Sequence, residues 1–152
     1  SPDGLFVGLR SYADDLVTGD TNNSFDTFVT ELDTAIIERS SVSSSGVQGN
    51  SDSGHPSFSS DNRFVAFPSL ATNLVTQDTN GFEDVFVRDR NAGLTKRISL
   101  SVNCEQGNNG SFQAMVSGNG LWVVFTSAAD NLVASDSNGA LDVFVRPNPL
   151  SP

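Results

Sequence analysis

The chain has 152 residues, of which 37% are hydrophobic and 11 are phenylalanine, so it can bury the core of one ordinary domain. Its net charge of −10 and isoelectric point of about 4.2 exclude nucleic acid and anionic membranes as favoured partners and suit cations. Cys104 is the only cysteine and His55 the only histidine, which excludes a disulfide framework and disfavours a zinc site. No apolar run approaches the roughly 18 residues of a membrane span.

A gapless repeat runs through the whole chain, with matching segments that start 58 residues apart. These segments begin at Asp20, Asp78 and Asp136 and read DTNNSFDTFV, DTNGFEDVFV and DSNGALDVFV. A period of this size is typical of stacked supersecondary units that bury their faces against one another. We therefore predict a single repeat array over residues 1–152, with repeats at 1–58, 59–116 and an incomplete one at 117–152.

Taken in chain order, the apolar and alternating stretches predict short β-strands joined by turns, and no helix longer than a turn or two. The predicted strands are Phe6–Leu9, Thr27–Thr30, Pro56–Ser59, Phe64–Phe67, Asp84–Asp89, Leu94–Leu100, Gln113–Ser117, Trp122–Phe125 and Val143–Arg146. Within each repeat the buried strand, such as Phe64–Phe67, is expected to pair with the strand after the long loop, here Val85–Arg88.

Four short antiparallel strands per repeat predict all-β architecture with β-propeller-type blades. The alternatives are a β-sandwich, which would not require gapless repetition, and a β-solenoid, whose coils are normally shorter. If the strands of a blade are lettered a to d from the inside, the chain holds b–c–d, then a–b–c–d, then a–b–c. Propellers have about four to eight blades, so two and a half cannot close. The chain is expected to belong to a longer propeller, or copies complete one another in a ring or filament.

The repeat resembles a known family. The segment PSFSSDNRFVAF from Pro56 is similar to the SPDG-type blade signature of TolB-like (WD40-like) β-propellers, and SPDG itself stands at Ser1–Gly4. The DxNGxxDVFV loop is similar to a bacterial, mostly secreted subgroup of these repeats. The resemblance covers the whole chain and implies an extracellular or cell-envelope protein. The resemblance says little about activity, because propellers host many functions.

Each repeat carries an acidic loop, Asp-x-Asn-Gly-x-x-Asp, with Asn23 in place of the glycine in the first copy. Asp and Asn at alternate positions of a tight turn supply the oxygens that Ca²⁺ prefers. The predicted cofactor is Ca²⁺, and its predicted ligands are Asp20, Asn22, Asp26, Asp78, Asn80, Asp84, Asp136, Asn138 and Asp142. The alternative is structural, because Asn-Gly favours positive φ and these side chains cap main-chain N–H groups in turns.

Catalytic signals are missing, so we predict no catalytic residues and a protein that is not an enzyme. No serine lies in G-x-S-x-G, and His55 lies in a turn, where an exposed or structural histidine is expected. Phe6, Phe64 and Trp122 share one repeat position, which predicts packing between blades rather than sugar stacking.

The predicted function is therefore a non-enzymatic extracellular structural or interaction module, stabilised by calcium. Its partners would be other copies of itself or the rest of a longer propeller. One alternative is a propeller domain with a glycan or peptide ligand. Another is an accessory propeller of a larger hydrolase, which a catalytic domain in a longer gene would establish.

Overall fold

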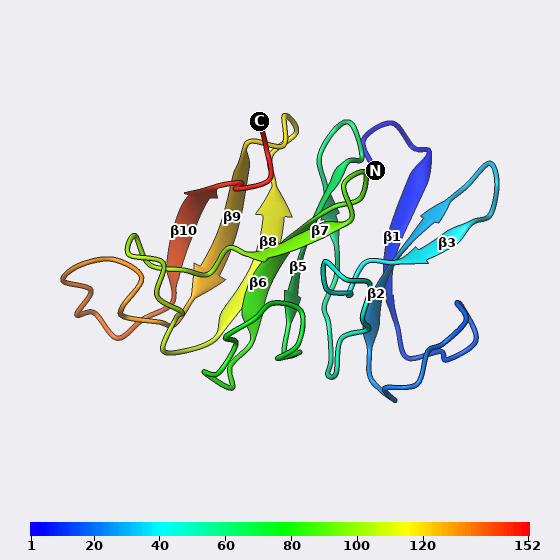
Figure 1. Ribbon diagram of the computed structural model, residues 1–152. Coiled ribbons are helices and arrows are strands. Elements are labelled where there is room, and N and C mark those ends of the chain that lie inside the picture. The colour runs from blue at the N-terminus through cyan, green and yellow to red at the C-terminus, as the bar shows by residue number, and fades with distance from the viewer.

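The computed structural model describes residues 1–152, and every regular element in it is a β-strand. Ten strands form three antiparallel sheets that stand side by side along the chain (Figure 1), and we call these sheets the first, second and third blades. Their strands are β1 (Phe6–Ser11), β2 (Asp26–Glu31) and β3 (Ile37–Arg39); β4 (Ser57–Phe58), β5 (Phe64–Ser69), β6 (Asp84–Asp89) and β7 (Leu94–Arg97); and β8 (Ser111–Val116), β9 (Trp122–Ser127) and β10 (Asp142–Pro147). The strand count of three, four and three confirms the predicted array of blades that does not close.

The predicted central pairs are present in all three blades, as β1 with β2, β5 with β6 and β9 with β10. The outer strand β7 ends at Arg97, earlier than the predicted Leu100. The reason is a side chain: the hydroxyl of Ser99 accepts the N–H of Val85 at 3.1 Å, in place of a backbone carbonyl. The inner strands β4 and β8 also differ from their predicted limits by a few residues.

The core lies between neighbouring blades. Side chains alternate along β5, so Phe64 and Ala66 pack against the third blade while Val65 and Phe67 pack against the first. The larger cluster joins the second and third blades, and Val123 and Phe125 of β9 belong to it. The smaller cluster joins the second blade to Val29 of the first. Strands β5 and β6 are therefore buried on both faces, which accounts for their nearly continuous apolar sequence.

The outer face of the third blade has no such cover. Trp122, Val143 and Val145 occupy the places in β9 and β10 that Phe64, Val85 and Val87 occupy in β5 and β6. The first three are 46, 67 and 52% exposed, whereas their counterparts in the second blade are 2, 0 and 0% exposed. The prediction of a buried position between blades is thus confirmed for Phe64 and wrong for Trp122, because no following blade lies over the third.

Candidate functional site

The acidic loops are turns anchored to the strand that follows each of them. In the second blade, the side-chain oxygen of Asn80 accepts the N–H of Phe82 at 3.2 Å, and its amide nitrogen donates to Asp84 at 3.1 Å. The other two loops repeat both contacts, through Asn22 with Asp26 and through Asn138 with Asp142. The residue after each asparagine has positive φ, as the sequence predicted, with values of 50° at Asn23, 71° at Gly81 and 63° at Gly139. The structural interpretation therefore accounts for the hydrogen bonds of these loops.

An arginine lies between the two carboxylates of the second loop. Nη1 of Arg97 is 2.9 Å from Oδ2 of Asp84 and 3.1 Å from Oδ1 of Asp78. The contact with Asp78 is an ion pair by distance but lacks hydrogen-bond geometry. The hydroxyl of Ser99 donates to the other oxygen of Asp84, and Nη1 of Arg97 also donates to Gln106 at 3.0 Å. The side chains of Arg97, Asp84 and Asp78 are only 8, 0 and 3% exposed, so the protein itself supplies the cation.

Burial is the largest influence on the pKa of Asp78. It raises the pKa of Asp78 above its ordinary value; the charge of Arg97 offsets part of that effect, and the charge of Asp84 adds to it. Two buried carboxylates therefore depend on one guanidinium, and its removal would leave uncompensated charge out of reach of water.

The first blade has the same construction. Nη1 of Arg39 lies 3.6 Å from Asp20 and 3.4 Å from Asp26, and the hydroxyl of Ser41 donates to Asp26. The amide of Gln48 donates to Asp20 at 2.7 Å and to Asp26 at 3.2 Å. All five polar side chains of the second loop thus have counterparts here.

Sequence reasoning missed these arginines, although a signal for them was present. The acidic loops of the first and second blades are followed by the pattern Arg-x-Ser with a glutamine further on, at Arg39, Ser41 and Gln48 and again at Arg97, Ser99 and Gln106. The two copies stand in the same 58-residue register as the acidic loops. We call the outer strand of a blade, together with the serine two residues after its arginine, the Arg-x-Ser strand.

The third loop has the same turn without the cation. Asp136 and Asp142 take part in no ion pair, and the third blade has no outer strand after β10. Strand β10 is the edge of its sheet, on the far left of Figure 1. A cleft of about 520 Å³ runs beside it and is lined by Asp136, Asn138, Asp142 and the residues of β10 up to Arg146. Its lining residues Ser135, Asp136 and Asp142 correspond in the 58-residue register to Gln77, Asp78 and Asp84, which contact Arg97 in the second blade.

The structure groups the nine predicted calcium ligands into three separate loops. In the first two loops a guanidinium faces the carboxylates, and in all three the asparagine oxygen accepts a backbone N–H. No group of three or more His, Cys, Asp or Glu side chains is arranged to hold a metal ion. Calcium binding stays a prediction.

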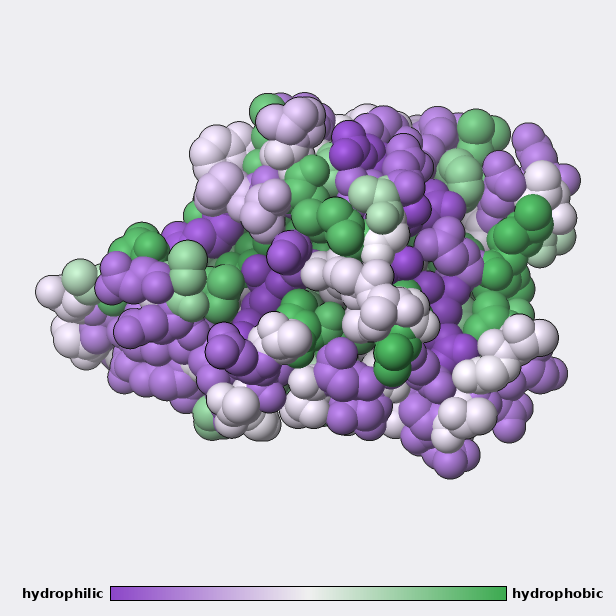
Figure 2. Space-filling model, viewed as in Figure 1, coloured by the Kyte–Doolittle hydropathy of each residue, from purple (hydrophilic) through white to green (hydrophobic).

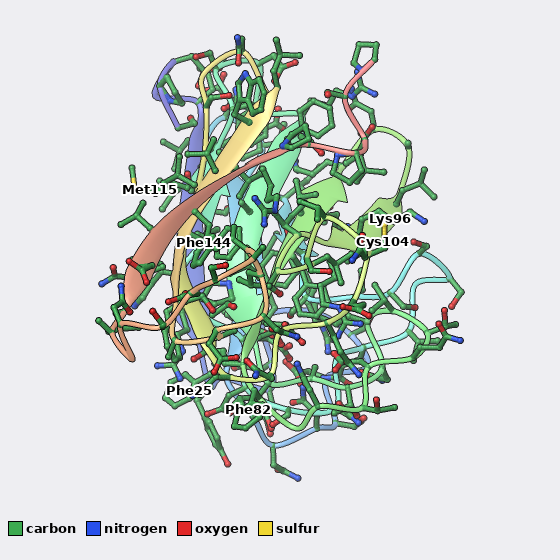
Figure 3. All side chains as sticks on the ribbon, turned by 90° about the vertical axis from the view of Figure 1, so that its left-hand side faces the viewer. Phe25, Phe82, Lys96, Cys104, Met115 and Phe144 are labelled. Atoms are coloured by element: carbon green, nitrogen blue, oxygen red, sulfur yellow. The ribbon has the colours of Figure 1, made fainter.

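The remaining candidates from the sequence lie elsewhere. His55 and Cys104 are both exposed, and Cys104 has a positive φ of 63° at the place where the first repeat has Gly46. His55 lines a second cleft of about 930 Å³ beside the inner strands, together with Arg10, Glu83 and Met115. Figure 3 shows Met115 at the rim of the molecule and Phe144 within it.

No helix of the chain is long and apolar enough to cross a membrane.

Solved structures share this arrangement of blades over nearly the whole chain. TolB from Acinetobacter baumannii superposes with a TM-score of 0.55 at 20% identity, which covers 95% of this chain and 27% of that one. The putative TolB from Agrobacterium tumefaciens superposes with a TM-score of 0.55 at 18% identity, which covers 99% of this chain and 57% of that one. The chain has a TolB-like β-propeller fold.

The chain spans only 27% and 57% of the two TolB chains. Hydrazine synthase from Kuenenia stuttgartiensis also matches, over 85% of this chain and 38% of that one. Its TM-score of 0.47 at 14% identity is too low to establish a shared fold. No protein-family model and no curated protein matches the chain. At these identities the likeness to TolB establishes the fold alone.

Proposed function

We propose that the chain is a non-enzymatic structural or interaction module, made of propeller blades that join further blades. Those blades belong to a longer propeller or to another copy of the chain. The observation that carries the proposal is the uncovered outer face of the third blade, around Trp122, Val143 and Val145.

The matching face of the second blade shows how much stabilisation the third blade lacks without a covering blade. There Phe64, Val85 and Val87 are buried in the core shared with the third blade. Burying one such side chain contributes about 1.5–3 kcal/mol, so an exposed set of three forgoes several kcal/mol of stabilisation. Exposed apolar faces and open sheet edges recruit partners. Figure 2 shows further apolar patches that interrupt a largely hydrophilic surface.

An extracellular or cell-envelope location in a bacterium is part of the proposal. Lys96 is the only lysine, while serine, asparagine, aspartate and glycine are abundant, a composition that suits such a location. The DxNGxxDVFV loops and the TolB-like fold also support it. Fractionation of the native host, with antibodies to the chain, would test it directly.

We propose calcium binding for the third loop alone. Arg39 and Arg97 already form ion pairs with the carboxylates of the first two loops, whereas Asp136 and Asp142 have no arginine. The side-chain oxygen of Asn138 accepts the N–H of Ala140, so backbone carbonyls and water would have to complete the six to eight oxygens that Ca²⁺ takes.

A second candidate function is glycan or peptide binding in the cleft of about 930 Å³ beside the inner strands. Its lining favours a mixed ligand, because Arg10, His55 and Glu83 offer polar groups and Met115 offers an apolar surface. A carbohydrate array and a peptide library would test this, with His55→Ala as the variant that should lose any binding found.

The main proposal is tested by the assembly state of the purified chain, measured by native mass spectrometry and sedimentation at micromolar concentration. We expect oligomers that Val145→Thr shifts toward monomer without lowering the melting temperature. The matched control is Val47→Thr, which makes the same change in the first repeat at a side chain that is 54% exposed, close to the 52% of Val145. A monodisperse, cooperatively folding monomer, or an equal effect of both variants, would contradict the proposal.

A further inference from the structure

The edge of β10 is an open main-chain edge beside two unneutralised carboxylates. In the second blade the corresponding edge is covered: the N–H of Ile98 donates to the carbonyl of Val85 at 2.7 Å, and the N–H of Val85 donates to Ser99. Val143 takes the place of Val85 in β10, because it pairs with Thr126 as Val85 pairs with Pro68. Its N–H and carbonyl therefore face the open side of the sheet.

The first and second blades show what covers such an edge. In both, the Arg-x-Ser strand returns along the central strand, with Phe28 opposite Arg39 and Phe86 opposite Arg97. Its arginine then enters the acidic loop, and its serine binds the aspartate at the start of the central strand. Phe144 and Asp142 offer the third blade the same two places.

The third loop already has the backbone conformation that the second loop adopts around Arg97. Gln77, whose carbonyl accepts from Nη2 of Arg97 at 3.2 Å, has φ 64°, and its counterpart Ser135 has φ 65°. The turn at Asn138 repeats two of the three hydrogen bonds of the Asn80 side chain; the third, from the Asn80 amide to the carbonyl of Gly107 at 2.9 Å, has no counterpart in the third loop. The backbone of the third loop thus already has the conformation that an arginine would contact, which reduces the ordering that binding requires.

We propose that the edge of β10 binds a β-strand carrying Arg-x-Ser, with the arginine between Asp136 and Asp142 and the serine on Asp142 and the N–H of Val143. The occupant is the outer strand of a propeller blade of this repeat type. This inference rests on the proposed function, and names the segment that completes the third blade. Arginine is required rather than lysine, because its fork of donors reaches two carboxylates and a backbone carbonyl at once.

The test is binding of a fluorescent peptide that copies residues 94–106 of this chain, with Cys104 changed to serine, measured by anisotropy. The peptide carries the arginine, serine and glutamine of the pattern. Replacing its arginine by glutamine should weaken binding about tenfold or more, because it removes charge-assisted hydrogen bonds. Replacement by lysine should also weaken it.

The protein variants locate the site. Asp142→Asn, which is nearly isosteric, should weaken binding of the parent peptide to a similar degree. Asp33→Asn removes the same charge from an exposed turn of the first blade and should leave binding unchanged. Thermal unfolding of both variants checks that they are folded. Ca²⁺ should compete with the peptide, because the two ligands need the same carboxylates.

Several results would overturn the inference. These are no binding of the parent peptide, equal binding of the glutamine peptide, or binding that Asp142→Asn leaves intact. Dimers that Asp142→Asn dissociates, without peptide binding, would assign the edge to a second copy instead. Assembly that Val145→Thr weakens, together with no peptide binding, would refute the proposed strand alone. A parent protein that stays monomeric would refute the proposed function itself.

Discussion

Replacing Arg97 by methionine tests whether this residue is the internal cation of the second acidic loop. Methionine keeps an apolar stem but removes the guanidinium that lies 2.9 Å from Asp84 and 3.1 Å from Asp78. The two carboxylates are 0 and 3% exposed, so water cannot replace the lost partner. Removing one member of a buried ion pair costs about 3–5 kcal/mol.

The expected effect on thermal unfolding is large. A domain of this size shifts its Tm by roughly 2–4 °C for each kcal/mol, so Arg97→Met should lower the Tm by roughly 6–20 °C at neutral pH. Calorimetry or circular dichroism measures this directly. The control is Lys96→Met, which removes the same charge from the adjacent exposed residue and should stay within about 0.5 kcal/mol.

The pH dependence of the stability lost in Arg97→Met provides a second test. Burial raises the pKa of Asp78 even with Arg97 present, so removing the arginine raises that pKa further. A carboxyl whose folded pKa is raised stabilises the fold at low pH, and that contribution is lost as pH rises through the folded pKa. The deficit of Arg97→Met should therefore shrink as pH falls. If Arg97→Met and Lys96→Met unfold at the same temperature at neutral pH, the arginine is not the internal cation.

Three further predictions concern the blades and their loops. Gly120→Ala should destabilise by roughly 1–3 kcal/mol more than Gly139→Ala in urea unfolding, because its Cβ would lie 2.6 Å from the ring of Phe64 while Gly139 faces open space; equal losses would contradict the close packing of the second and third blades. Burial opposes ionisation of Asp89, but hydrogen bonds from an arginine and two backbone N–H groups lower its pKa below the ordinary 3.8, so Asp89→Asn should destabilise at neutral pH and the difference should disappear as pH falls through that lowered pKa; a pH-independent difference would contradict this. Ca²⁺ at a hundredfold excess over its dissociation constant should stabilise by about 2.7 kcal/mol over EDTA, and Asp142→Asn should remove that gain; equal melting temperatures in Ca²⁺ and EDTA would end the calcium prediction.

Much of the fold could be read from the sequence because a blade is a local structure. The central strand pair of each blade forms within one repeat, so the 58-residue register aligned three examples of it and two of each inner and outer strand. The continuous apolar run from Phe64 predicted a strand buried on both faces, which β5 is. Counting strands was enough to show that the array does not close.

The acidic loops were also found from sequence, but the groups that satisfy them were not. Arg97 stands 13 residues after Asp84 and is brought back to it only by the antiparallel return of β7 along β6. The carboxylate pattern by itself suggested a metal site, although an arginine repeats in the same register. Which partner a buried carboxylate takes depends on strand register, and that register is a tertiary property.

Which faces stay open was decided by the tertiary structure alone. Phe64 and Trp122 occupy one repeat position, yet their exposed fractions are 2% and 46%. The sequence specifies an apolar side chain at both places, because each blade is built to pack against the next. Burial depends on whether a next blade is there, and the local pattern of residues does not contain that information.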